Sequence, residues 1–339
     1  MTPRPIFLLS LPRSGSTLVQ RLLAAHPAIS TAPEPWILLP QVYALRERGG
    51  FADYGHVPAA RAIGEFAERL PDGVGAYRSM IRELALGLYE AASDDGAEYF
   101  IDKTPRYHLI AGDLFEIFPE AAFVFLWRHP VAVACSIAET WSGGRWNLER
   151  WRRDLFDGPG NLVDAFEANS ERAIAIRFED LLTEPDRSLG EIFSYLGLPD
   201  APDVVGSFGS VRLDARMGDP TGVTRYDEVS REPLDRWKAS ISNPLRKRWS
   251  KRYLTRLGPD RLATMGYDLP GLLAELDAIP VGARRLSSDL ASSIVATAGR
   301  AGRELGARVL WRTVEASRAR EPERPPPPED AGRSACARG

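Results

Sequence analysis

The sequence predicts an α/β fold in which a P-loop-like parallel β-sheet is flanked by helices and followed by a helical C-terminal extension. Four short apolar runs have the composition of strands buried on both faces, and they lie at residues 6–11, 99–102, 121–127 and 173–178. Segments with apolar residues at helical spacing separate these runs. An alternation of strands and helices is typical of a parallel sheet, because each crossover between parallel strands needs a long connection.

The first strand and the helix after it contain the clearest candidate for a binding site. The apolar run 6–11 ends at Pro12, a turn of small and polar residues follows, and apolar residues return at helical spacing from Leu18. This arrangement places backbone N–H groups and the positive end of a helix dipole at one point, which favours an anion. The nucleotide-binding pattern G-x-x-x-x-G-K-[ST] is absent, and the cation is Arg13 instead. We expect a phosphate or sulfate group at this turn, bound by Arg13, Gly15 and the hydroxyl-bearing Ser14, Ser16 and Thr17.

Two further cations follow the ends of predicted strands. Lys103 comes after the strand at 99–102, and Arg128 comes after the strand at 121–127. In parallel α/β sheets the carboxyl ends of the strands share one edge, and ligands bind beyond that edge. We therefore expect Arg13, Lys103 and Arg128 to converge on one rim and to form an anion site larger than the turn alone.

The remaining segments are interpreted from the positions of their glycine and proline residues and from the spacing of their apolar residues. Residues 107–118 and 147–170 have helical patterns, the second broken at Gly158-Pro159-Gly160. Residues 51–73 contain glycine, proline and scattered charges, and we expect them to form a mobile surface segment. The least patterned segments are 51–73, 142–160 and 199–217, and we expect them to determine which molecule the chain selects.

Composition excludes several classes of protein. The 339 residues are 44% hydrophobic and 26% charged, which is typical of a soluble globular protein. A net charge of −3 argues against bulk binding to nucleic acid. The two cysteines, Cys135 and Cys336, indicate neither a disulfide framework nor a metal cluster. The N-terminal apolar run is too short for a secretory signal or a membrane span, so we expect a cytoplasmic protein.

Four stretches of the chain, taken together, resemble the motifs of a known family. They are LPRSGSTL at 11–18, APEPWILLP at 32–40, DKTP at 102–105 and WRHPVAVACS at 127–136. The family is that of the sulfotransferases that use 3′-phosphoadenosine 5′-phosphosulfate (PAPS), in particular its bacterial and protein-tyrosine branches. Weaker similarity occurs in IRFEDLL at 176–182 and GDPTGV at 218–223, so that the resemblance spans residues 5 to about 268.

The resemblance implies a transferase that moves the sulfuryl group of PAPS to a hydroxyl group of a small molecule, glycan or lipid by in-line displacement, without a metal ion. The turn at 11–18 is similar to the family's 5′-phosphosulfate loop, and Arg128 with Ser136 is similar to its 3′-phosphate motif. The implied catalytic residues are Arg13, Lys103 as the cation on the leaving group, and Glu34 as the base. The implied donor-binding residues are Arg13, Ser14, Gly15, Ser16, Thr17, Arg128 and Ser136.

The base for the acceptor hydroxyl has two candidates. Glu34 lies between Pro33 and Pro35, which restrict the backbone on either side of it. Its alternative roles are a helix N-cap and a solvated loop acid. His108, shortly after Lys103, is the second candidate, because histidine often acts as a general base. Two other functions stay open: a P-loop-type nucleotide kinase, and a non-catalytic nucleotide-binding protein of the same fold.

Three segments make up the predicted domain organisation. We expect residues 1–280 to form the sulfotransferase domain, 281–320 to form a basic amphipathic helical extension, and 321–339 to form a disordered tail containing four consecutive prolines. Within the extension, residues 284–320 are interpreted as a helix packed on the domain. The alternative for this helix is weak contact with a membrane surface or a partner. The oligomeric state stays open.

Overall fold

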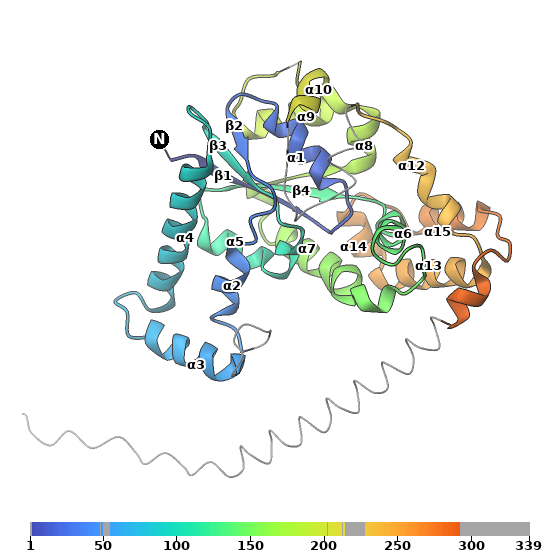
Figure 1. The fold of residues 1–339 in the computed structure, drawn as a ribbon, viewed down its shortest axis with the longest axis horizontal. Coiled ribbons are helices and arrows are strands. Elements are labelled where there is room, and N and C mark those ends of the chain that lie inside the picture. Colours follow the sequence, from blue (N-terminus) through green and yellow to red (C-terminus); the bar gives the residue numbers. More distant parts are fainter. Residues whose placement is uncertain are drawn as a thin grey trace, which may run out of the picture. The chain divides into compact units, whose positions relative to one another are not determined.

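Five strands form the central sheet that positions the site. The computed structural model describes residues 2–47, 49, 55–201, 203–211, 213 and 228–291. Within them the strands are β1 (Arg4–Ser10), β2 (Ile29–Thr31), β3 (Tyr99–Asp102), β4 (Ala122–Trp127) and β5 (Ala173–Arg177). They pair in the order β2-β3-β1-β4-β5, and the four pairings between them are parallel (Figure 1). The predicted parallel α/β fold is confirmed.

β1 lies in the middle of this sheet, which explains its unbroken apolar sequence. Ile6 is in register with Ile101 of β3 and with Ala122 of β4. Successive side chains of a strand point to opposite faces, so Ile6 contributes to one core and Phe7 to the other. Because helices cover both faces, neither set of side chains meets water, and no polar alternation is needed.

The first face of the sheet packs against the N-terminal helix and three helices from later in the chain. These are α1 (Ser16–Ala24), α8 (Phe178–Thr183), α9 (Pro185–Leu196) and α10 (Val204–Ser207). The core between them and the sheet contains mostly branched aliphatic side chains, among them Ile6, Leu8, Val19, Leu22, Val124 and Ile192. α1 therefore joins this layer directly after the turn that carries the candidate anion site.

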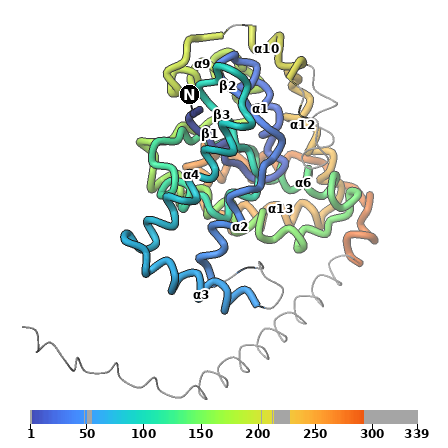
Figure 2. Tube along the Cα trace, turned by 60° about the vertical axis from the view of Figure 1, so that its left-hand side comes forward, coloured from blue at the N-terminus to red at the C-terminus, as the bar shows by residue number. Residues whose placement is uncertain are grey.

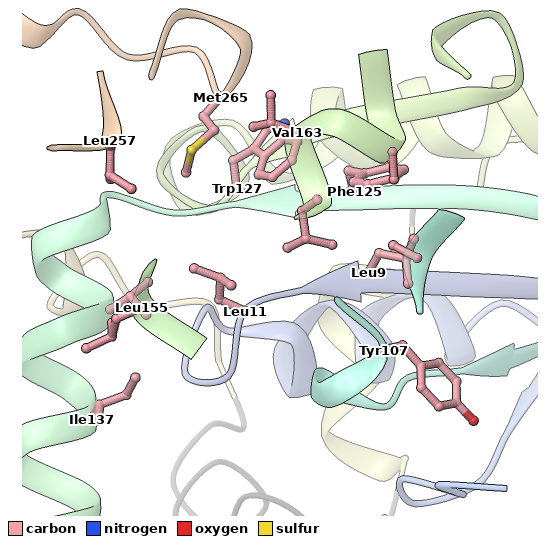
Figure 3. Close-up of a cluster of buried hydrophobic side chains, with 14 of the residues drawn as sticks. Leu9, Leu11, Tyr107, Phe125, Trp127, Ile137, Leu155, Val163, Leu257 and Met265 are labelled. Carbon is pink, nitrogen blue, oxygen red and sulfur yellow. The ribbon is translucent and has the colours of Figure 1, made fainter. Parts of the chain in front are cut away.

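The second face packs against a larger and more aromatic layer. Its helices are α2 (Leu38–Tyr43), α4 (Gly73–Ala92), α5 (Ala111–Ile117), α6 (Pro130–Trp141), α7 (Gly158–Glu167), α13 (Pro244–Leu257), α14 (Pro259–Thr264) and α15 (Leu269–Ala278). Figure 3 shows part of this core, in which Phe125 and Trp127 of β4 lie among Leu9, Val163 and Met265. The chain therefore folds as two helical layers around one sheet.

The remaining elements connect these layers. α3 (His56–Ala67) contacts α4 and lies at the end of α4 that is farther from the sheet, as both views show (Figures 1 and 2). α12 (Pro233–Arg236) precedes α13. Short helical turns complete the described chain: η1 (Pro105–Leu109), η2 (Leu148–Trp151), η3 (Arg153–Asp157), η4 (Ser170–Arg172), η5 (Phe208–Ser210) and η6 (Trp237–Ser240).

Several local predictions are wrong, each for an identifiable reason. The described part of 51–73 contains the helix α3, which was not predicted from the sequence. Gly158-Pro159-Gly160 does not break a helix but begins α7, since a proline in the first turn forfeits no helical hydrogen bond. The single helix expected at 107–118 is divided into η1 and α5 at Ile110, whose φ is −131°. The strand β2 lacks a long apolar run and was not predicted.

The folded unit extends beyond residue 280. The first compact unit of the chain comprises Met1–Leu290. Near the end of the first unit, Asp289 accepts hydrogen bonds of 2.6 and 3.0 Å from the Arg246 guanidinium of α13, and both side chains are buried. The predicted helix at 284–320 beyond residue 291, the predicted tail at 321–339 and the GDPTGV stretch lie outside the described residues. Among the helices of the described ranges, none combines the length and apolarity needed to cross a membrane.

Candidate active site

Charged side chains stand along one edge of the sheet in the order of its strands. Glu34 follows β2, Lys103 follows β3, the turn 11–17 follows β1, and Arg128 follows β4. Because the strands are parallel, these four points lie beyond the same edge. The structure therefore brings the predicted base and the predicted cations onto one rim.

The turn 11–17 is held in a compact form by its own backbone. The Ser14 N–H donates to the Leu11 carbonyl oxygen at 3.3 Å, and two residues take left-handed conformations, Arg13 at φ +67° and Gly15 at φ +92°. Glycine is required at the second position, because a Cβ there would lie 2.2 Å from Cε2 of Phe178. α1 begins directly after Gly15, and the first N–H groups of a helix have no acceptor within it. The turn thus offers backbone donors and a helix N-terminus to an anion.

Arg128 and Ser136 lie on the β4 side of this turn. The Arg128 guanidinium donates from Nη1 to the Arg13 carbonyl oxygen at 2.9 Å and lies 4.5 Å from the centre of the Phe178 ring. Arg13 Nε donates to Ser136 Oγ at 3.3 Å. These three polar side chains line a cavity of about 670 Å³, together with Arg236, Arg246, Arg284 and Arg285. The Arg13 side chain therefore lies with the predicted 3′-phosphate pair, whereas its backbone belongs to the turn.

Glu34 and Lys103 form a nearly buried ion pair on the β3 side of the turn. Lys103 Nζ lies 2.8 Å from Glu34 Oε1, and the two side chains are 3% and 10% exposed for lysine and glutamate. The indole N–H of Trp36 donates to the other carboxylate oxygen, Oε2, at 3.2 Å. Lys103 Nζ also lies 3.5 Å from the Thr17 hydroxyl of the turn. Lys103 thus connects the Glu34 carboxylate with the turn 11–17.

This geometry rules out the two structural alternatives for Glu34. α2 begins only at Leu38, and the residue at its N-cap position is Ile37, which forms no side-chain cap. A carboxylate that is 10% exposed and bonded to Lys103 and Trp36 is not a solvated loop acid. Glu34 is instead fixed at the rim by two partners.

Asp102, the last residue of β3, immediately precedes Lys103 and was not among the predicted site residues. It is fully buried and accepts hydrogen bonds from the hydroxyl groups of Tyr89 at 2.6 Å, Tyr107 at 3.0 Å and Thr104 at 3.0 Å. Burial raises the pKa of the Asp102 carboxyl to about 6, although these hydrogen bonds and the nearby Lys103 charge act in the opposite direction. The one sequence signal for Asp102 is its position next to Lys103 in the DKTP motif.

Comparison with known proteins agrees with the sequence motifs. A family model described as "Sulfotransferase family" matches residues 5–203, more than half of the chain. The chain belongs to the sulfotransferase family. The predicted family is therefore confirmed, which favours sulfuryl transfer over the nucleotide-kinase alternative.

Individual relatives and one solved structure support the same assignment. Nodulation protein NoeE of Sinorhizobium fredii (strain NBRC 101917 / NGR234) is 40% identical over 307 residues, which cover 79% of this chain and 67% of that protein. Protein-tyrosine sulfotransferase 2 of Gallus gallus is 24% identical over 277 residues, covering 78% of this chain and 69% of that protein. The sulfotransferase domain of the Synechococcus PCC 7002 olefin synthase has a TM-score of 0.54 at 24% identity, covering 79% of this chain and 97% of that domain. The last likeness supports the fold.

The four histidines of this sulfotransferase have structural partners away from Glu34. His108, the second candidate for the base, is buried with Nε2 3.1 Å from Asp154 Oδ1, and the same oxygen lies 3.1 Å from Arg106 Nε. His129 accepts from the first N–H groups of α6 and stacks on Trp237. The other two hydrogen-bond to backbone groups: His26 accepts from the Ala28 N–H, and His56 is bonded to the Arg46 carbonyl.

Side chains suited to a metal ion do not gather at this rim. Across the described ranges, no group of three or more histidine, cysteine, aspartate or glutamate side chains is arranged to hold a metal. Cys135 is buried in α6, and burial raises the pKa of its thiol far above the ordinary value. Among the described residues, the charged side chains that line the cavity beside Arg128 are arginines and one carboxylate, that of Glu139.

Proposed function

We propose that this sulfotransferase moves the sulfuryl group of PAPS to a hydroxyl group of a small molecule, glycan or lipid, with Glu34 as the base. The observation that carries the proposal is the buried Glu34–Lys103 pair, 2.8 Å apart, next to an anion-binding turn. A carboxylate and an ammonium group at this position supply the two charges that the transfer needs. One accepts a proton from the acceptor, and the other neutralises charge on the leaving phosphate.

The residues of the rim fit a donor with two separate anionic ends. The turn 11–17 supplies backbone N–H groups and hydroxyls, which suit the 5′-phosphosulfate end. Arg128, Ser136 and the Arg13 side chain suit the 3′-phosphate, and the cavity that they line is bordered mostly by polar and cationic side chains. Gly15 allows the turn to pack against Phe178 without a Cβ, which keeps the two subsites close together.

The proposed reaction is an in-line displacement at sulfur. The acceptor oxygen forms a new S–O bond while the bond between sulfur and the 5′-phosphate oxygen breaks, and the phosphate leaves as part of 3′-phosphoadenosine 5′-phosphate (PAP). Glu34 takes the proton of the acceptor hydroxyl, so the products are a sulfate ester, PAP and one proton. Lys103 is within reach of both sides of the reaction, because its ammonium group lies between Glu34 and Thr17 of the turn.

Calorimetric titration with PAP and an acceptor screen with labelled PAPS test this proposal. We expect the wild type to bind PAP and to sulfate at least one class of hydroxyl acceptor. Glu34→Gln removes the proton acceptor but keeps the shape, so we expect unchanged PAP affinity and loss of turnover by at least about 100-fold. Glu83→Gln, at an exposed position of α4, is the matched control and should keep full turnover.

The outcomes separate the alternatives. Absence of PAP binding to the wild type would refute the proposal as a whole. PAP binding without transfer to any acceptor supports the non-catalytic binding protein instead. Full turnover by Glu34→Gln would refute the role of Glu34 as the base while leaving the donor site intact.

A further inference from the structure

Asp102, which immediately precedes Lys103, is the centre of a buried hydrogen-bond network. Its Oδ1 accepts from the Thr104 hydroxyl at 3.0 Å, and its Oδ2 accepts from the hydroxyls of Tyr89 and Tyr107 at 2.6 and 3.0 Å. The Asp102 side chain has no exposure to solvent. A carboxylate buried to this degree is costly, and the three donors together offset that cost.

Two of these hydroxyls also accept hydrogen bonds from the backbone that follows Glu34. The Trp36 N–H donates to Thr104 Oγ1 at 3.2 Å, and the Leu38 N–H donates to the Tyr107 hydroxyl oxygen at 3.2 Å. A hydroxyl has one proton, and here each gives that proton to Asp102. Asp102 therefore orients both hydroxyls so that their lone pairs face residues 36–38.

The segment held in this way controls the Glu34 carboxylate. Trp36 has φ +60°, a conformation that is unfavourable for a bulky side chain and needs support from its surroundings. From that conformation its indole N–H reaches Glu34 Oε2 at 3.2 Å. The other oxygen, Oε1, is held by Lys103, which is adjacent to Asp102 in sequence. Both carboxylate oxygens are thus held by residues anchored at or next to Asp102.

We propose that Asp102 is a positioning residue, which acts through the hydroxyls of Thr104 and Tyr107 to hold residues 36–38 and thereby to aim Glu34 at the acceptor. The inference rests on the proposed function, in which Glu34 takes the acceptor proton. It predicts a specific kinetic result. Loosening the network lowers kcat, because the base is misplaced, but leaves donor binding unchanged, because the turn 11–17 and Arg128 lie on the other side of Lys103.

Two tyrosines provide a matched pair for the test. Tyr107→Phe and Tyr89→Phe each remove one buried hydroxyl that donates to Asp102 Oδ2, but only the Tyr107 hydroxyl also accepts from the Leu38 backbone. At pH 8, above the pKa of about 6 for Asp102, we expect Tyr107→Phe to lower kcat about tenfold. Tyr89→Phe should lower kcat less than twofold, and both variants should bind PAP with the wild-type Kd.

Thr104 provides a rescue experiment at the other oxygen of Asp102. Thr104→Val keeps the shape but removes the hydroxyl that accepts from Trp36, so we expect a fall in kcat of about tenfold with the KM for PAPS unchanged. Thr104→Ser keeps the hydroxyl and should restore kcat to within about threefold of the wild type. A general loss of packing would instead affect both substitutions and the Kd for PAP.

The results distinguish this inference from the proposed function. Equal kcat values for Tyr107→Phe and Tyr89→Phe, or full activity of Thr104→Val, while Glu34→Gln is inactive, overturn the positioning role alone. A rise in the Kd for PAP in parallel with the fall in kcat also overturns it, because the network would then support the whole site. Full activity of Glu34→Gln would refute the base assignment on which the inference depends.

Discussion

Replacement of Gly15 by alanine tests whether the close packing of the turn is what makes the donor site. Gly15 has φ +92° and immediately precedes α1, and its Cα faces the ring of Phe178. A Cβ added at this position would lie 2.2 Å from Phe178 Cε2 and 2.5 Å from Cδ2. Real contacts of this kind do not occur, so either the ring or the turn must move. Movement of the turn displaces the backbone donors from the rim.

The expected cost has two parts that the structure lets us separate. A left-handed conformation costs a residue with a Cβ about 1–2 kcal/mol. Inserting a methyl group into a packed site costs about 1–3 kcal/mol more, depending on how far Phe178 can yield. We therefore expect Gly15→Ala to lower the free energy of unfolding by about 2–5 kcal/mol and to weaken PAP binding by at least about 30-fold.

Urea unfolding and PAP titration measure the two effects, and two further variants interpret them. Gly87→Ala is the matched control, since Gly87 lies inside α4 and a Cβ there meets no atom within 4 Å. It should raise the free energy of unfolding by about 0.5–1 kcal/mol. In the double variant Gly15→Ala/Phe178→Ala, the loss should be smaller than the sum of the single losses by about 1–3 kcal/mol, which is the steric part. If the Gly15→Ala variant unfolds at the same urea concentration as the wild type and binds PAP equally well, the reasoning is refuted.

Three other predictions follow from the charges. Arg128→Ala should weaken PAP binding by at least about 30-fold but AMP binding, which lacks the 3′-phosphate, by less than about threefold; equal losses in the two titrations would contradict the 3′-phosphate role. Burial raises the pKa of Asp102 from 3.8 to about 6 in the folded state. Between pH 3.8 and 6 the folded state therefore binds more protons than the unfolded state, so the free energy of unfolding falls as the pH rises. Relative to Asp102→Asn, the free energy of unfolding of the wild type should fall by about 2.4 kcal/mol between pH 4 and 7 in urea titrations. The same pH dependence in both proteins would contradict the raised pKa. Arg246→Met removes the guanidinium that pairs with the buried Asp289 carboxylate and should cost about 3–5 kcal/mol. Arg246→Met/Asp289→Leu should recover most of that cost; no recovery in urea unfolding would show that the cost is not electrostatic.

The parts of the fold that the sequence predicts are those specified by local pattern. The apolar run of β1, the small-residue turn and the helical spacing of α1 occur within one continuous stretch, and the structure forms all three there. The cations at strand ends were predicted on the same basis, because parallel strands place their ends on one edge. The local sequence pattern therefore predicts the position of the rim and three of its charged residues, Arg13, Lys103 and Arg128.

The missing parts depend on contacts between distant segments. β2 has only three residues, and it becomes a strand because Ile29–Thr31 pair with 99–101 of β3. Asp102 looks from its sequence like a polar residue at a strand end, and its burial depends on Tyr89 from α4. The direction of the Arg13 side chain depends on its left-handed backbone and on Ser136, far along the chain. None of these has a periodic signal.

The short strand β2 explains why Glu34 pairs closely with Lys103 but interacts only weakly with Arg128. Strands in a sheet lie about 4.8 Å apart, so β2 and β4 are separated by three spacings, or about 14 Å. At that distance and an effective dielectric constant of 20, Glu34 and Arg128 attract each other by only about 1 kcal/mol. Lys103 directly follows β3, the strand between β2 and β1, and its ammonium group pairs with Glu34 at 2.8 Å. Had the chain lacked β2, nothing in the sheet order would fix Glu34 on the far side of Lys103. The strand order therefore places the proposed base at one end of the rim and the proposed 3′-phosphate ligand Arg128 towards the other.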